Sequence, residues 1–190
     1  MRTESVTLSV DQRGFTLTDL LVVIALIGIL AGITVISIER ALTDVRGDNA
    51  VTQIASALRQ ARDAAIAQQR PIDIFFLPPN GVQVRRNEIP GGQTTLANFN
   101  LDHGAIFDLD ASLPDTPDDF GNDEAVDFGG AATIQFRSDG VLVDETGLPL
   151  NGTIFLMRPG ELSSARAITV TGGTGRTQGY QWMGSHWEIQ

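Results

Sequence analysis

An apolar run near the N-terminus limits the folds that this chain can adopt. Residues 20–38 contain no charged side chain, and their only polar side chains are Thr34 and Ser37. At a rise of about 1.5 Å per residue, a helix over this run nearly matches the ~30 Å hydrocarbon core of a bilayer. The run is longer than the apolar part of a cleaved secretory signal, which has about 7–15 residues. The sequence therefore predicts a membrane-spanning helix over residues 15–38.

An acidic residue, Asp19, stands at the start of this run. A carboxylate deep in a bilayer costs about 2.5–3.5 kcal/mol on insertion scales, so Asp19 requires a partner or a function. One interpretation is that Asp19 only stabilises the N-terminus of the helix, where a negative charge contributes about 0.3–1 kcal/mol. The other is that Asp19 has a partner or a function beyond the helix start.

The order of glycine, aromatic, acid and apolar run resembles the class III signal of type IV pilins and type II secretion pseudopilins. The resemblance implies that a prepilin peptidase cuts between Gly14 and Phe15, and that the new Phe15 amine is methylated. Asp19 occupies the position where that family usually has Glu. The freed amine would pair with Asp19 of a neighbouring subunit, and such a pair is stronger in a low-dielectric environment than at a surface.

Composition excludes several other classes of protein. The chain has 190 residues with a net charge of −10, and all its basic side chains are Arg. This acidic balance is not typical of a nucleic-acid-binding protein. Because there is no Cys, a disulfide framework and a thiolate metal site are both excluded. The two histidines, His103 and His186, have no metal-ligand spacing, and no catalytic constellation is present, so an enzyme is not expected.

A helical pattern continues beyond the apolar run. Steps of three and four residues give one apolar stripe, made by Val51, Ile54, Leu58, Ala61 and Ala65. The pattern predicts one long helix from about Phe15 to about Gln69, which ends before Pro71.

Glycines mark two further features of this helix. The segment Gly47-Asp48-Asn49 is its weakest point, because glycine costs about 1 kcal/mol relative to alanine in a helix. Gly28 and Gly32 have GxxxG spacing and are candidates for close helix packing.

Beyond Pro71 the period changes from helix to strand. We expect hairpins formed by 72–77 with 82–86, by 132–137 with 141–144, and by 153–158 with 165–171, and a final strand near 180–189. Residues from about 87 to 130 are rich in Gly, Pro and Asp and are expected to be irregular. The order of helix and hairpins predicts an α+β fold in which a small antiparallel sheet packs on the helix.

Downstream segments resemble the GspH/FimT branch of pilin-like proteins. The relevant stretches are ALRQARDAAIAQQRPIDIFF, TIQFRSDGVLVD and ITVTGGTGRT, with Phe136 to Gly140 and Gly175-Arg176 as the recurring hairpin and turn. This resemblance implies a long helix whose second half packs against a head of two small β-sheets. The expected organisation is a leader at 1–14, a membrane and filament-core helix at 15–38, an amphipathic helix half at 39–70 and a β-rich head at 71–190.

Two candidate binding sites remain in the head. Some FimT-like relatives bind DNA through Arg residues of the late turn, which makes Arg176 a candidate, although Gln178 stands where those relatives carry a second Arg. The acidic residues Asp115, Asp118, Asp119 and Asp123 are candidate oxygen ligands for Ca²⁺. A plain hairpin loop and a solvated acidic loop are the respective alternatives, and no other cofactor is expected.

The leading hypothesis is a minor pseudopilin of a type II secretion system, held in the bacterial inner membrane by one helix with its head in the periplasm. Its expected partners are other pseudopilins or pilins, a prepilin peptidase and the inner-membrane assembly platform. The alternatives are a FimT/FimU-like minor pilin of a type IV pilus or DNA-uptake machine, and a membrane-tethered periplasmic binding module. A tethered enzyme is a further alternative.

Overall fold

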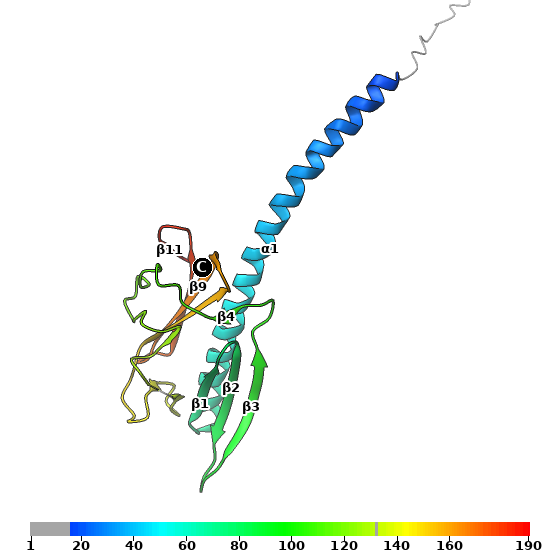
Figure 1. The fold of residues 1–190 in the computed structure, drawn as a ribbon. Coiled ribbons are helices and arrows are strands. Elements are labelled where there is room, and N and C mark those ends of the chain that lie inside the picture. Colours follow the sequence, from blue (N-terminus) through cyan, green and yellow to red (C-terminus); the bar gives the residue numbers. More distant parts are fainter. Residues whose placement is uncertain (1–15, 132) are drawn as a thin grey trace, which may run out of the picture. The chain divides into compact units, whose positions relative to one another are not determined.

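The computed structural model describes residues 16–131 and 133–190, and for residues 33–46 it describes the backbone without the side chains (Figure 1). The chain divides into two compact units, Met1–Ala41 and Leu42–Gln190. Helix α1 (Leu17–Gln68) contributes to both units. Its last residues follow the prediction, because Gln69 takes a left-handed conformation (φ 52°) and Pro71 cannot continue a helix.

The apolar stripe of α1 is buried, as its spacing predicts. Val51, Ile54, Leu58, Ala61 and Ala65 are all at most 6% exposed. They share one core cluster with residues of the first β-sheet, among them Ile72, Ile74 and Phe136. The C-terminal half of α1 is therefore part of the head, held there by apolar burial.

All strands of the described residues belong to two antiparallel sheets. The first has the order β3-β2-β1-β6-β7, and the second has the order β11-β10-β9-β8-β4, with β5 also paired to β8. The strands are β1 (Ile72–Leu77), β2 (Gly81–Asn87), β3 (Gln93–Asn100), β4 (Ile106–Phe107), β5 (Val126–Asp127), β6 (Ile134–Phe136), β7 (Leu142–Val143), β8 (Gly152–Arg158), β9 (Glu161–Thr171), β10 (Arg176–Trp182) and β11 (Trp187–Ile189). The predicted α+β fold is confirmed.

The three predicted hairpins are present as β1–β2, β6–β7 and β8–β9. Each joins two strands that are close in the sequence. Gly140 lies in the turn of the second hairpin and Gly160 in the turn of the third, whereas Gly81 is the first residue of β2. Local turn chemistry was therefore sufficient to predict them.

Two strand predictions were wrong. Residues 87–130 are not wholly irregular, because they contain β3, β4 and β5. The final strand near 180–189 is two strands, β10 and β11, which pair through Trp182 opposite Trp187. The indole rings of these tryptophans lie edge to face, 5.2 Å apart, and belong to a second core cluster. Burial of the two rings against each other explains why the chain folds back at this point.

Candidate functional site

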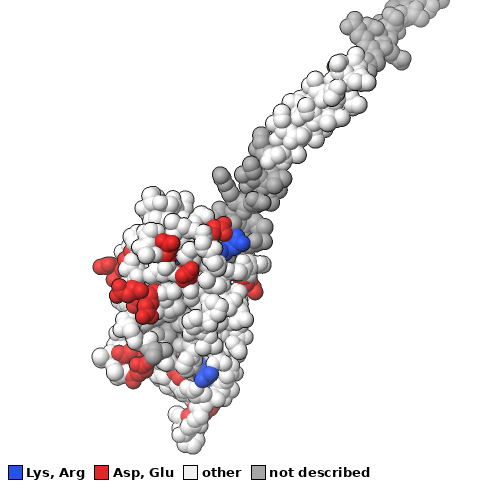
Figure 2. Space-filling model, in the orientation of Figure 1, with Lys and Arg blue, Asp and Glu red and all other residues white. Residues whose placement is uncertain are grey.

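The first unit exposes apolar side chains on every side of the helix. Large exposed residues are Leu17, Leu20, Leu21, Val22, Val23, Ile24, Leu26, Ile27, Ile29 and Leu30, with exposed fractions from 42% to 77%. Figure 2 shows this segment almost entirely in the colour of uncharged residues. A helix that is apolar all round requires burial by lipid or by other chains.

Asp19 closes the first turn of α1. One carboxylate oxygen, Oδ2, accepts hydrogen bonds from the Thr16 N–H at 3.0 Å and from the Thr16 hydroxyl at 2.7 Å. The Asp19 N–H in turn faces the Thr16 hydroxyl at 3.3 Å. This reciprocal arrangement is a capping box, so Asp19 does stabilise the helix start in the single chain. Among the described residues, the other oxygen, Oδ1, receives no hydrogen bond, and it is free to accept one from another chain.

Gly28 and Gly32 leave open surface on this segment. A Cβ atom added at either position would meet no atom within 4 Å in the single chain. Another helix could therefore approach this surface without a steric clash. Close helix packing at Gly28 and Gly32 stays a prediction.

Two further predictions concern residues at or near the edge of the described chain. Gly14 and Phe15, the predicted cleavage pair, lie outside the described residues. Within the part of the chain that is described, no helix has the length and apolarity required to cross a membrane. The predicted span over 15–38 is thus not confirmed, and its residues 33–38 have no described side chains.

In the second unit, Arg62 of α1 joins two glycine turns. Its Nε donates to the Gly140 carbonyl at 3.1 Å. A Cβ on Gly175 would lie 2.5 Å from Arg62 Cδ and 3.0 Å from the Gly140 carbonyl oxygen. Both glycines have positive φ, 81° at Gly140 and 65° at Gly175. The predicted hairpin and late turn therefore meet at one side chain of the helix, and this contact requires glycine at both positions.

Arg176, next to that turn, is exposed. Its guanidinium donates to the Gln178 side chain at 3.4 Å, and its backbone N–H donates to the Thr174 hydroxyl at 3.3 Å. Gln178, which stands where some relatives have a second Arg, is thus the hydrogen-bond partner of Arg176 and adds no positive charge.

The four acidic candidates for calcium have separate structural contacts. Asp115 accepts the N–H of Thr116 at 2.6 Å and the N–H of Gly121 at 2.9 Å. Asp118 accepts the hydroxyls of Thr169 at 2.5 Å and Tyr180 at 2.9 Å. No group of three or more Asp, Glu or His side chains among the described residues is arranged to hold a metal ion.

Asp119 and Asp123 have local contacts, and the backbone N–H of Asp119 donates to the Thr116 carbonyl at 2.9 Å. Asp119 takes a left-handed backbone conformation (φ 57°), and the backbone N–H of Asp123 donates to Asp127 at 3.0 Å. On the face seen in Figure 2, acidic side chains are far more numerous than basic ones over the head. The calcium prediction stays a prediction.

The family model described as type II transport protein GspH matches residues 50–175, which is about two thirds of the chain. The chain belongs to this GspH family. A second model, the prokaryotic N-terminal methylation motif, matches residues 10–35, where the predicted cleavage pair and Asp19 lie. The resemblance inferred from the sequence is confirmed by these matches. GspH-family and related pilin-like proteins are structural subunits that assemble with other pilins in a filament.

Solved structures are also similar to this GspH-family chain. The type IV minor pilin FimU of Pseudomonas aeruginosa has 16% identity and a TM-score of 0.49, covering 74% of this chain and 91% of FimU. The minor pseudopilin EpsH from the type 2 secretion system of Vibrio cholerae has 10% identity and a TM-score of 0.46, covering 69% of this chain and 93% of EpsH. No curated protein gives a significant sequence match.

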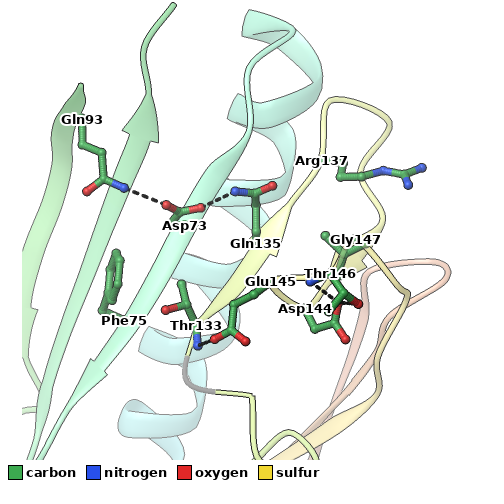
Figure 3. A pocket seen from close by; sticks show the side chains of 11 residues that line it. Asp73, Phe75, Gln93, Thr133, Gln135, Arg137, Asp144, Glu145, Thr146 and Gly147 are labelled. Carbon is green, nitrogen blue, oxygen red and sulfur yellow. Dashed lines mark hydrogen bonds between the residues drawn. The ribbon is translucent and has the colours of Figure 1, made fainter. Parts of the chain in front are cut away.

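The GspH-family head also contains a polar pocket that the sequence did not indicate (Figure 3). It has a volume of about 480 Å³ on the polar face of the first sheet, and the turn 144–147 forms one wall. Asp73, only 6% exposed, accepts amide hydrogen bonds from Asn87 at 3.0 Å, Gln93 at 2.9 Å and Gln135 at 2.6 Å. The three amides satisfy a buried carboxylate without a cation, so this group fixes strands β1, β2, β3 and β6 together. Asp73 is the one charged residue of the apolar segment IDIFFL, and this was the only sign of the hydrogen-bonded group in the sequence.

Proposed function

We propose that this chain is a minor pseudopilin, a structural subunit of the periplasmic filament of a type II secretion system. The observation that carries the proposal is the N-terminal helix, which is apolar all round in residues 20–32 and has one carboxylate, Asp19, in its first turn. Exposure of such an apolar surface to water is unfavourable, whereas a bundle of similar helices would bury it. The match to the family of type II transport protein GspH supports secretion as the setting.

Assembly begins, in this proposal, with processing. A prepilin peptidase cuts between Gly14 and Phe15, and the new Phe15 amine is methylated. The cut creates a positive charge beside the helix, and Oδ1 of Asp19 in a neighbouring subunit accepts a hydrogen bond from it. In a low-dielectric filament core this pair fixes the axial position of the incoming subunit, because an unpaired carboxylate there is costly.

Before assembly, the helix holds the protein in the bacterial inner membrane and the head lies in the periplasm. The assembly platform then moves the subunit from lipid into the filament. Lipid and neighbouring helices are both apolar, so van der Waals packing and the new ion pair must supply the difference in free energy. Gly28 and Gly32, where an added Cβ atom would meet no neighbour within 4 Å, would allow close approach of a second helix.

A type IV pilus or DNA-uptake system is the competing setting. The net charge of −10 and the pairing of Arg176 with Gln178 favour secretion, because DNA binding requires a basic surface. Deletion of the gene for this chain in the native host distinguishes the two settings. Loss of protein export with normal twitching and normal DNA uptake supports a secretion system. The reverse result would assign the chain to a pilus.

Processing itself is tested by co-expression of the full chain with a prepilin peptidase and mass analysis of its N-terminus. We expect a methylated Phe15 at the terminus, and we expect the Gly14→Leu variant to stay uncut under the same conditions. Functional protein from the native host that still begins at Met1 would overturn the filament proposal. A membrane-tethered binding module would give that result.

A further inference from the structure

Strand β3 forms an open edge of the first sheet. It is the terminal strand in the order β3-β2-β1-β6-β7, and no other strand of the described residues pairs with its outer side. Its eight residues, QTTLANFN, include no charge and no proline. Soluble proteins usually protect a long edge strand with such residues, since its free backbone groups bind other strands. Of these protective residues, β3 has neither a charge nor a proline.

The free backbone groups of β3 can be assigned from the ladder. The Leu101 N–H donates to the Asn80 carbonyl at 2.8 Å, next to the pair Gly81–Asn100. Residues of an antiparallel strand alternate between facing the partner strand and facing away from it. The peptide groups of Asn98 and Asn100 therefore point outward, where they can hydrogen-bond to another strand.

A β-bulge opens an apolar groove beside this edge. The register shifts between Val84 and Arg85, so Leu96 has no residue opposite it on β2. Leu96, Ala97 and Phe99 of β3 lie along one side of a groove of about 370 Å³. The α1 side consists of three alanines and three uncharged polar residues, Ala57, Ala61, Ala64, Gln53, Ser56 and Gln60. Leu96 is 40% exposed there. The small side chains of α1 leave room for apolar side chains from a strand added to β3.

Charge restricts what the groove can accept. None of its lining residues is ionised, although the chain has a net charge of −10. An incoming strand therefore meets no charged side chain of the groove lining, and an uncharged segment loses no ion hydration when it is buried.

From the open edge, the bulge and the uncharged groove, we propose that β3 is a docking site for an extended strand of another subunit in the filament. The incoming strand pairs with the outward backbone groups of Asn98 and Asn100, and its alternate apolar side chains fill the groove. This proposal rests on the proposed function, because it takes the partner to be a filament subunit.

The test uses photo-crosslinking in the native host with the full chain. A photoreactive amino acid is placed at Thr95, an exposed residue of β3, and in a second strain at Ile24 of the N-terminal helix segment, which is 59% exposed. We expect both positions to crosslink to pilin-like proteins identified by mass spectrometry. We expect Leu96→Glu or Asn98→Pro to lower the Thr95 crosslink at least tenfold and to leave the Ile24 crosslink unchanged.

Leu162→Glu is the matched control for Leu96→Glu, because Leu162 is similarly exposed (37%) and lies in the second sheet. Thermal melting of the full-length variants in detergent checks that each still folds. If Ile24 crosslinks to pilins but Thr95 crosslinks to nothing or to an exported protein, the strand proposal is overturned and the proposed function stands. Absence of pilin crosslinks at both positions would overturn both proposals.

Discussion

Arg166 of β9 donates from its Nε to the carboxylate of Asp48, at 3.0 Å, across 118 residues of sequence. The Arg166 side chain is fully buried, whereas that of Asp48 is 50% exposed. A Cβ atom on Gly47 would lie 3.1 Å from the guanidinium carbon of Arg166. Gly47, which the sequence indicated as a weak point of the helix, is thus the place where a buried cation lies against the helix backbone. A larger side chain at this position would crowd the Arg166 guanidinium.

The first prediction concerns this ion pair. Asp48→Ala should lower the free energy of unfolding by about 1.5–3 kcal/mol, because the buried guanidinium loses one charge-assisted hydrogen bond. Asp63→Ala, the same change at an exposed position of the same helix, should cost less than about 0.5 kcal/mol. Urea unfolding of the full chain in detergent measures both. Equal effects of the two changes would show that the pair contributes nothing.

The second prediction separates packing from backbone strain. Gly175→Ala places a Cβ 2.5 Å from Arg62 Cδ at a φ of 65°, whereas Gly147→Ala places one in open space at a φ of 84°. The Gly147 variant should cost about 1–2 kcal/mol from strain alone. The Gly175 variant should cost about 1–3 kcal/mol more, because Arg62 must move and give up its bond to the Gly140 carbonyl. Thermal melting compares the stabilities of the two variants. Similar losses of stability would mean that Arg62 can move at no cost in free energy.

The third prediction concerns Tyr180, the chain's one tyrosine. Burial, together with its hydrogen bond to Asp118, raises the pKa of Tyr180 to about 12. The folded state holds a proton that the unfolded state releases near pH 10, so this contribution to stability is complete below pH 10 and is lost as the pH rises toward 12. The ultraviolet absorbance of tyrosinate should therefore titrate near pH 12 in folded protein and near pH 10 in urea. Tyr180→Phe should remove the matching pH dependence of unfolding and cost about 1–2 kcal/mol at neutral pH. Titration of the folded protein near pH 10 would contradict the burial of this hydroxyl.

Local patterns explain which parts of this fold could be predicted. The stripe that includes Ile54 and Leu58 has helical spacing, and the hairpin turn at Gly140 carries its own glycine, so neither needed information from distant residues. Strand β3 was missed because the bulge at Leu96 shifts the alternation of its side chains, and because an exposed edge strand has little apolar pattern.

The contacts inside the head could not be read from the sequence, since their partners are far apart in it. Nothing near Arg166 indicates Asp48, and nothing near Asp73 indicates Gln135, which lies 62 residues away. The candidate assembly residue Asp19 was easier to identify from the sequence, because it is an acid beside an apolar run. Its capping box with Thr16 could be expected from their spacing of three residues.

The last prediction distinguishes the two roles of Asp19. Thr16→Val removes the hydroxyl that caps the helix and leaves the carboxylate, so it should cost about 1 kcal/mol of helix stability and reduce incorporation into filaments by less than threefold. Asp19→Ala removes the partner of the Phe15 amine and should reduce incorporation at least tenfold, while Asp19→Glu, with a longer side chain that keeps the charge, should retain it. The measurement is the share of processed protein in sheared filaments relative to the membrane fraction. If Thr16→Val and Asp19→Ala fail to the same extent, Asp19 acts through the cap alone. If both assemble normally, the apolar surface of the helix is sufficient for assembly and the ion pair is dispensable.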